Sequence, residues 1–191
     1  MDILVDRLCK SYGSEKVLTD FTYTFPEGKL TCIMGRSGGG KTTLIRILLG
    51  LEQADKGRVE GLSGKKIRAV FQEDRLCENL SAAANIRLVC KTHLSDEELK
   101  AAFQRVCLEE VVGKPVRELS GGMKRRVAIL RALFSEYDCL ILDEPFKGLD
   151  EETKRQTVSY LLEQTKGKTV LAVTHEEEDT VLLKAEKMIR M

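Results

Sequence analysis

Apolar side chains alternate with polar ones, or run unbroken, over six short segments of the chain, which predicts strands. Near the N-terminus they alternate, as in half-buried strands. Towards the C-terminus the runs DCLILDE and TVLAVTH are continuous, as in strands buried on both faces of a parallel sheet. The expected strands are residues 3–8, 17–25, 29–35, 67–72, 138–144 and 169–175.

Other segments carry apolar side chains at helical spacing. Leu44, Ile47, Leu48 and Leu51 would share one face of a helix over residues 41–52. Further helices are expected within 94–111, where Ser95 and Glu98 fit a capping box, after residue 119, with the apolar stripe Met123, Val127, Leu130 and Phe134, and over 151–167, where a glycine closes the helix.

The order of these elements predicts the fold class. Strands that alternate with helices imply right-handed crossovers and a parallel sheet. The expected α/β fold has a mainly parallel sheet, an N-terminal antiparallel β portion and a small helical subdomain at about 73–120, where the chain turns polar. The 191 residues suit a single domain, with a core formed by 1–72 and 121–191.

Composition narrows the functional classes. The net charge of +1 gives no overall basic field, so nucleic acid is not an expected partner. The six cysteines show no metal-finger spacing and are expected to be reduced. No apolar run approaches the roughly 20 residues that span a bilayer, so a role in membrane transport would require another chain to form the channel.

The segment GRSGGGKT at 35–42 matches the pattern G-x-x-x-x-G-K-[ST] after a strand and at the start of a helix. Its glycines allow backbone N–H groups to surround phosphate oxygens. Lys41 would supply a charge to the β- and γ-phosphates, and Thr42 a hydroxyl to Mg²⁺. In this context a nucleotide-binding loop is favoured over a chance match.

Several polar residues end strands, where open α/β sheets bind ligands. Asp143 and Glu144 alone would more often be a solvated turn, but the phosphate loop reverses that preference. Asp143 would then hold Mg²⁺, and Glu144 would polarise the water that attacks the γ-phosphate. Gln72 and His175 also end strands, and Tyr12 could stack on a purine, although each of these three alone is more often a surface or packing residue.

A second pair of glycines begins a later helix, in LSGGMKRR at 119–126. A serine-capped helix N-terminus with two glycines is a typical anion site, so the chain carries two such sites. Lys124, Arg125 and Arg126 are predicted to form a solvated basic face rather than to contact phosphate.

In chain order the motifs are SYG, GRSGGGKTT, FQED, LSGGM, LILDEP, GLD and VTH. From residue 3 to residue 175 the sequence resembles the ATP-binding subunits of ABC transporters. LSGG is the specific element, because other phosphate-loop ATPases lack it.

The resemblance implies a role for each matching residue. Glu144, His175 and Lys41 would be catalytic, and Thr42, Gln72 and Asp143 would hold Mg²⁺. ATP would contact Tyr12, Gly35, Arg36, Ser37, Gly38, Gly39, Gly40, Lys41, Thr42, Thr43, Gln72 and Asp143 of one subunit, and Ser120, Gly121, Gly122, Met123 and Asp150 of the other.

The resemblance also implies partners and explains the two anion sites. In this family two subunits pack head to tail, so the phosphate loop of one faces the LSGG helix of the other across ATP. The implied partners are a second copy or a related ATP subunit and a separately encoded membrane subunit, with no nucleic acid. The implied cofactors are ATP and Mg²⁺, and the implied location is cytoplasmic, peripheral on the inner face of the cell membrane.

Some positions depart from the usual family pattern. Lys147 and Gly148 stand where Ser-Ala is more usual, and Met123 stands where many members have glutamine. LSGGM, FQEDRL and DEPF resemble the nitrate, sulfonate and taurine importer branch, which implies import of a small solute without naming it.

Three alternatives stay open: an exporter subunit, a soluble ABC-type ATPase that acts on ribosomes or DNA, and a nucleotide-binding scaffold without turnover. The ribosomal kind usually carries two ATP domains in one chain, whereas this sequence has one. The chromosomal kind separates the phosphate loop and the LSGG motif by a long coiled coil, whereas the interval between them is short here. Glu144 and His175 argue against a scaffold.

Overall fold

The computed structural model describes residues 1–36 and 38–191, and its strands form two sheets. The larger sheet is parallel throughout, in the order β5-β6-β7-β3-β8, and the smaller one is antiparallel, in the order β2-β1-β4. The strands are β1 (Ile3–Tyr12), β2 (Glu15–Phe25), β3 (Leu30–Met34), β4 (Lys56–Glu60), β5 (Ile67–Val70), β6 (Cys139–Asp143), β7 (Thr169–Thr174) and β8 (Lys187–Arg190).

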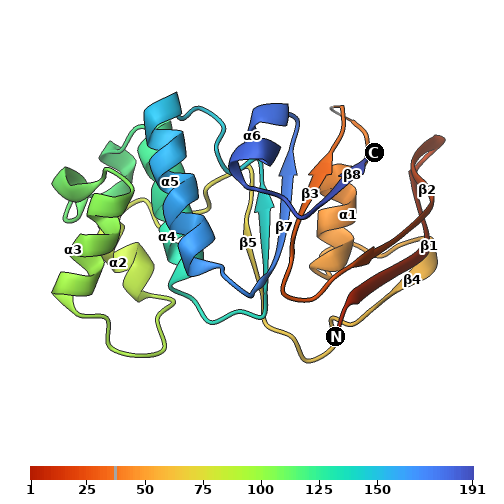
Figure 1. Cartoon of the computed structure of the whole chain (residues 1–191), viewed down its shortest axis with the longest axis horizontal. Helices are drawn as coiled ribbons and strands as arrows, with labels where there is room; N and C mark the ends of the chain where they lie inside the picture. The colour runs from red at the N-terminus through yellow and green to blue at the C-terminus, as the bar shows by residue number, and fades with distance from the viewer. Residues whose placement is uncertain (37) are drawn as a thin grey trace.

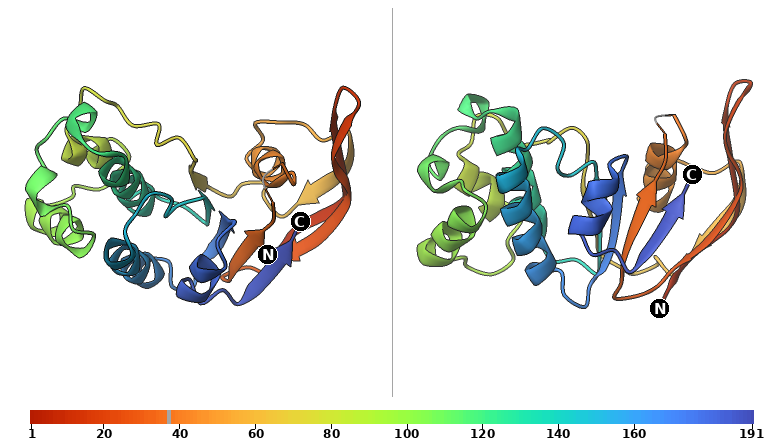
Figure 2. Two further views of the ribbon diagram at one scale, coloured as in Figure 1. Left: turned by 90° about the horizontal axis from the view of Figure 1, so that it is seen from above. Right: turned by 45° about the horizontal axis from the view of Figure 1, so that its top comes forward.

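Six α-helices accompany these sheets in the part of the chain that the structure describes. They are α1 (Lys41–Leu48), α2 (Ala82–Arg87), α3 (Asp96–Arg105), α4 (Gly121–Leu133), α5 (Glu151–Gln164) and α6 (Glu177–Leu182). In Figure 1 and Figure 2 the parallel sheet occupies the middle, with α2 and α3 at one end and the antiparallel sheet at the other. The predicted α/β fold class, with its antiparallel N-terminal portion, is confirmed.

Both faces of the parallel sheet are buried, as the continuous apolar runs predict. Alternate residues of one strand enter different cores: Leu140 packs with α4 and α5, whereas Ile141 packs with α1 and the antiparallel sheet. Cys32 and Cys139 are completely buried in these strands as free thiols, and burial raises the pKa of each to about 12. The two thiols therefore act as small apolar side chains.

A third apolar cluster lies away from the sheets and holds the helical portion together. Its members come from residues 82–119 and from the outward face of α4 and α5, including Val127, Leu130 and Tyr160. An ion-pair cluster also links the helical portion to the parallel sheet. The carboxylate of Glu136, beyond α4, pairs with Lys66, just before β5, and with Lys91, from the loop after α2. These two lysines lower the pKa of Glu136 to about 2.

The first helix is shorter than predicted. Gly50 has a φ of 68°, and its N–H donates to Ile47 O while the next N–H donates to Arg46 O. This is the hydrogen-bond pattern of a glycine that ends a helix. Leu51 consequently lies beyond the helix and is 52% exposed, so its predicted place on the apolar face of that helix is wrong.

The helix predicted within 94–111 is also interrupted. Its start is as expected, because Ser95 and Glu98 form a capping box. α3 ends at Arg105, and Cys107 has a φ of 53° before a single 3₁₀ turn, Glu109–Val111. The carbonyl oxygens of Val106 and Cys107 accept hydrogen bonds from Arg126, so a side chain of α4 satisfies the helix end.

Candidate functional site

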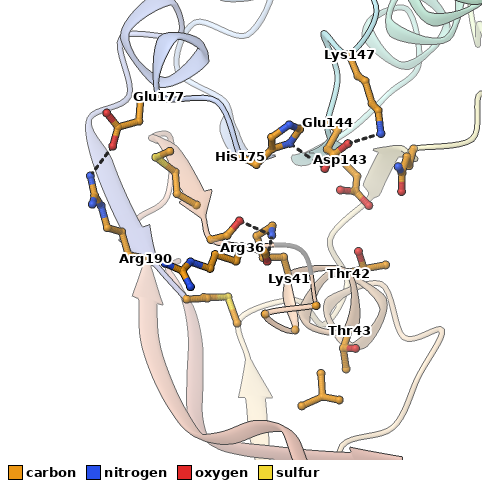
Figure 3. Close-up of a pocket in the computed structure, with 18 of the residues that line it drawn as sticks. Arg36, Lys41, Thr42, Thr43, Asp143, Glu144, Lys147, His175, Glu177 and Arg190 are labelled. Carbon is orange, nitrogen blue, oxygen red and sulfur yellow. Dashed lines mark hydrogen bonds and ion pairs between the residues drawn. The ribbon is translucent and has the colours of Figure 1, made fainter.

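Register within the parallel sheet brings three sequence-distant segments to one edge. Met34 pairs with Thr174, and Asp143 pairs with Val173, so β3, β6 and β7 end at the same level. The residues that follow these strands therefore lie side by side. They line a cleft of about 960 Å³, shown in Figure 3.

The glycine-rich loop forms one wall of this cleft. Gly40 precedes α1 with a φ of 84°, and a Cβ atom there would lie 2.7 Å from Val17 O, so only glycine fits. With no side chain at this capping position, the N–H groups of the first turn remain available to an anion. Lys41 is buried, and its Nζ donates to the carbonyl oxygens of Gly35 (2.7 Å) and Arg36 (2.8 Å).

Two acids at the end of β6 form the opposite wall. Asp143 is 5% exposed, and burial followed by the charge of Glu144 raises its pKa. Glu144 adopts a φ of 47°, a conformation rare for a residue with a side chain. Its Oε1 lies 3.1 Å from His175 Nδ1, and its Oε2 lies 3.3 Å from Lys147 Nζ (Figure 3).

A second recess, of about 590 Å³, opens at the N-terminus of α4. Ser120 caps this helix, because its hydroxyl accepts the N–H of Met123 at 3.3 Å. Gly121 faces open space, whereas a Cβ atom on Gly122 would lie 3.2 Å from Leu149. Asp150 lines the same recess and caps α5, and the backbone N–H of the third residue beyond it is the main cause of its lowered pKa.

Two of the three basic residues after the LSGG motif, hereafter the signature, are buried. The prediction of a solvated basic face is therefore wrong for these two. Arg125 is 6% exposed and donates to the carbonyl oxygens of Phe71 and Gln72, with Asp74 Oδ1 3.3 Å from its Nε. Arg126 is buried as well, and burial lowers its pKa. Both guanidinium groups satisfy backbone carbonyls, a role that a run of basic letters does not reveal.

Most of the sequence-predicted site residues line one of the two recesses. Tyr12 lines neither the cleft nor the recess and is 46% exposed, while Glu15 and Val17 of the same hairpin reach the cleft instead. Met123 contributes its N–H to the serine cap, and Ser37 falls outside the described residues. The cleft is lined by Gly35, Arg36, Gly38, Gly39, Gly40, Lys41, Thr42, Thr43, Gln72, Asp143, Glu144 and His175, and the recess by Ser120, Gly121, Gly122 and Asp150.

Three ion-paired residues that were not predicted also line the cleft. Lys147 lies against Glu144, and Arg190 pairs with Glu177 at 3.0 Å on the far rim. The departure from the usual Ser-Ala at 147–148 was the only signal in the sequence that could have drawn attention to one of them.

The oxygen donors in the cleft suit Mg²⁺ held together with phosphates. Thr42, Gln72 and Asp143 bring a hydroxyl, an amide and a buried carboxylate to the cleft. Within 1–36 and 38–191, no group of three or more His, Cys, Asp or Glu side chains could enclose a metal ion. Mg²⁺ typically has only a few protein ligands, because it keeps several waters and binds substrate phosphates.

A family profile described as ABC transporter matches residues 18–147, a range that includes the glycine loop, Gln72, Ser120 and the two acids at the end of β6. The chain belongs to the ABC transporter family. As a member it is an ATPase subunit of the ABC type, and its fold agrees with that of solved ABC cassettes. The dimeric structure of a bacterial ABC transporter cassette matches with a TM-score of 0.83 and 28% identity, over 99% of this chain and 94% of that one.

Curated relatives of this ABC chain are importer subunits by name. The aliphatic sulfonates import ATP-binding protein of Pseudomonas syringae pv. tomato is 36% identical over 96% of this chain and 78% of its own. The sulfate/thiosulfate import ATP-binding protein of Nephroselmis olivacea is 32% identical, and the spermidine/putrescine import ATP-binding protein of Haemophilus influenzae is 33% identical. The match to the first of these two covers 95% of this chain and 57% of the relative, and the match to the second covers 91% of this chain and 51% of the relative.

An ATP-bound exporter of the Atm1 family matches with a TM-score of 0.85 but 21% identity, which shows a shared fold. Among the helices that the structure describes for this ABC chain, none has both the length and the apolar character needed to cross a bilayer.

Proposed function

We propose that this ATPase subunit powers import of a small solute through a separate membrane subunit, and that a second copy completes each of its ATP sites. The observation that carries the proposal is the division of anion-binding elements between two recesses on one chain. The glycine loop and the acids line the cleft, whereas Ser120 and Gly121 are exposed and line a different recess. Two head-to-tail copies would bring the two kinds of recess together.

Within the cleft each residue would have a defined task. The N–H groups of the glycine loop and the ammonium of Lys41 would bind the β- and γ-phosphates. Thr42, Gln72 and Asp143 would hold Mg²⁺, which neutralises phosphate charge. The remaining ATP contacts are those implied by the resemblance, including Tyr12, which would stack on the adenine ring.

Glu144 would act on the attacking water. Its carboxylate would accept a proton from water as the water oxygen bonds to the γ-phosphorus and the bond to the ADP oxygen breaks. The proton passes to the phosphate product, so Glu144 is regenerated. His175, 3.1 Å from Oε1, would hold the carboxylate in place.

The partner copy would supply Ser120, Gly121, Gly122, Met123 and Asp150 to the γ-phosphate side of the nucleotide. The 1–72 and 121–191 segments would form the ATP-binding core, and 73–120 a small helical subdomain. The importer names of the relatives support import. The place on the inner face of the cell membrane is the one that the resemblance implies.

Replacement of Glu144 by glutamine tests the ATPase assignment. Glu144→Gln should reduce the turnover number for ATP by at least about 100-fold, the usual contribution of a general base, while Mg·ATP still binds and traps dimers visible by size-exclusion chromatography. Glu178→Gln, at an exposed carboxylate of α6, is the matched control and should keep the wild-type rate. A Glu144→Gln chain that hydrolyses ATP normally would refute the role of Glu144.

Transport requires a membrane subunit, which a second experiment tests. The chain should co-purify from detergent-solubilised membranes with a co-expressed protein that has several apolar helices of about 20 residues. Vesicles that contain both proteins should accumulate solute only when ATP is enclosed with the ATPase subunit inside them, whereas accumulation driven by ATP outside would indicate an exporter. A stable association with ribosomes instead would favour the soluble alternative.

A further inference from the structure

Lys147 is the unexpected cation of the cleft. It follows the two acids by a few residues, and its Nζ lies 3.3 Å from Glu144 Oε2 (Figure 3). The Lys147 side chain is 55% exposed and that of Glu144 is 20% exposed, so the contact sits at the mouth of the cleft. Glu144 Oε2 is buried and accepts no hydrogen bond among the described residues, so the ion pair is its one polar contact there.

The other lysine and arginines that line the cleft, Lys41, Arg36 and Arg190, make no ion pair with Glu144 among the described residues. Lys41 donates to two backbone carbonyls, and Arg190 pairs with Glu177. His175 contacts the opposite oxygen of the carboxylate, and it carries a charge only when protonated. Among the described residues, Lys147 is therefore the one permanent cation in contact with Glu144.

Neutralisation of Glu144 matters because of what must bind beside it. Asp143 and Glu144 already place two carboxylates at one strand end, and the γ-phosphate of ATP brings more negative charge to the same wall. Like charges at close range in a partly buried site repel strongly. ADP lacks the γ-phosphate, so an unneutralised Glu144 would oppose ATP more than ADP.

Lys147 also has a special position between the two recesses. Among the residues described, it alone lines both the cleft and the recess of Ser120. Its ammonium is thus placed where the two subunits of the proposed dimer would meet.

We propose that Lys147 is a positioning residue that holds and neutralises Glu144, so that the γ-phosphate of ATP can bind beside that carboxylate. The inference rests on the proposed nucleotide site and adds to it a means of favouring ATP over ADP. Lys147 acts through Glu144, so its effect should require the glutamate charge.

The test compares nucleotide affinities by isothermal titration calorimetry, with Mg²⁺ and either ADP or the β,γ-imido analogue of ATP, which prevents hydrolysis. Lys147→Met keeps the length and removes the charge, Lys147→Arg keeps the charge, and Lys166→Met removes an exposed lysine from the turn after α5. Lys147→Met should weaken analogue binding by about fivefold, the scale of a half-exposed ion pair, and ADP binding by less than about twofold. Lys147→Arg and Lys166→Met should match the wild type.

The same substitution in the Glu144→Gln background decides how Lys147 acts. Without the glutamate charge, Lys147→Met should change analogue affinity by less than about twofold. An undiminished loss in that background would show direct contact with the nucleotide and overturn the inference, as would equal losses for ADP and analogue or no loss at all. A wild-type chain that binds neither nucleotide overturns the proposed site as well, whereas normal binding with an indifferent Lys147 overturns this inference alone.

Discussion

Single buried cations fix the backbone around the cleft. The guanidinium of Arg125 joins α4 to the loop of Gln72, because it donates to the carbonyl oxygens of Phe71 and Gln72 and faces Asp74. The pKa of Asp74 is nevertheless raised, since burial outweighs the attraction of Arg125. Arg125 therefore offsets part of the cost of burying this carboxylate.

Arg125→Met should lower the free energy of unfolding by about 3 kcal/mol, because two carbonyls and a part-buried carboxylate lose their partner. Urea denaturation followed by circular dichroism measures the change. Lys124→Met is the control, since Lys124 is more exposed and makes one 3.5 Å contact with Glu78; its effect should stay below about 0.5 kcal/mol. Equal losses for the two variants would contradict the structural role of Arg125.

For single residues, the sequence correctly predicted those whose position is fixed by a contiguous motif. Gly40 and Lys41 are consecutive at the junction of the glycine loop and α1, so their placement follows from spacing alone. Arg125 and Arg126 were misjudged because all but one of their carbonyl partners lie 19 to 54 positions away in the chain. Only the packing of α4 against the 71–74 loop and the end of α3 creates those contacts.

At the scale of elements, a buried ion network joins α5 to α6. Lys154 Nζ lies 2.7 Å from Glu176 Oε2 and 2.9 Å from Asp179 Oδ1, and Thr174 donates to the other oxygen of Asp179 at 2.8 Å. Asp179 is 3% exposed. The network connects the helix that begins after Asp150 with the segment that carries His175.

Lys154→Met should lower the free energy of unfolding by about 3 kcal/mol, because Asp179 is left as an uncompensated buried charge. Lys154→Met combined with Asp179→Asn removes that charge and should recover at least about half of the loss. Thermal and urea unfolding measure both, with Arg155→Met, at an exposed pair with Glu151, as control. A double variant less stable than Lys154→Met would contradict this account.

Elements with a clear apolar pattern were predictable, and short elements without one were not. β6 and β7 follow from unbroken apolar runs. β4 reads KGRVE, is mostly exposed, and exists because it pairs with β1, a long-range contact with no local signal. α2 and α6 have six residues each, too short for a helical period to appear in the sequence.

At the scale of the whole molecule, the geometry separates two halves of a composite site. The cleft and the signature recess are distinct cavities that share only Lys147 among the described residues. A ligand in the cleft of one chain therefore does not reach Ser120 of that chain. The proposed head-to-tail dimer predicts that two differently damaged chains should repair each other.

Lys41→Met disables the cleft, and Gly121→Trp should block the signature recess without disturbing the fold, since a Cβ atom at Gly121 meets nothing within 4 Å. Each variant alone should hydrolyse ATP at a rate reduced at least about 100-fold. In an equal mixture about half of the dimers pair the two variants, and each such dimer has one site built from an intact cleft and an intact recess. If the sites act independently, steady-state ATPase should return to about a quarter of the wild-type rate per chain.

Recovery can arise only if one subunit's glycine loop works with the other's Ser120 helix, because neither chain supplies both parts. A mixture no faster than the average of its components, under conditions where both variants still dimerise with wild type, would show that each chain completes its own site.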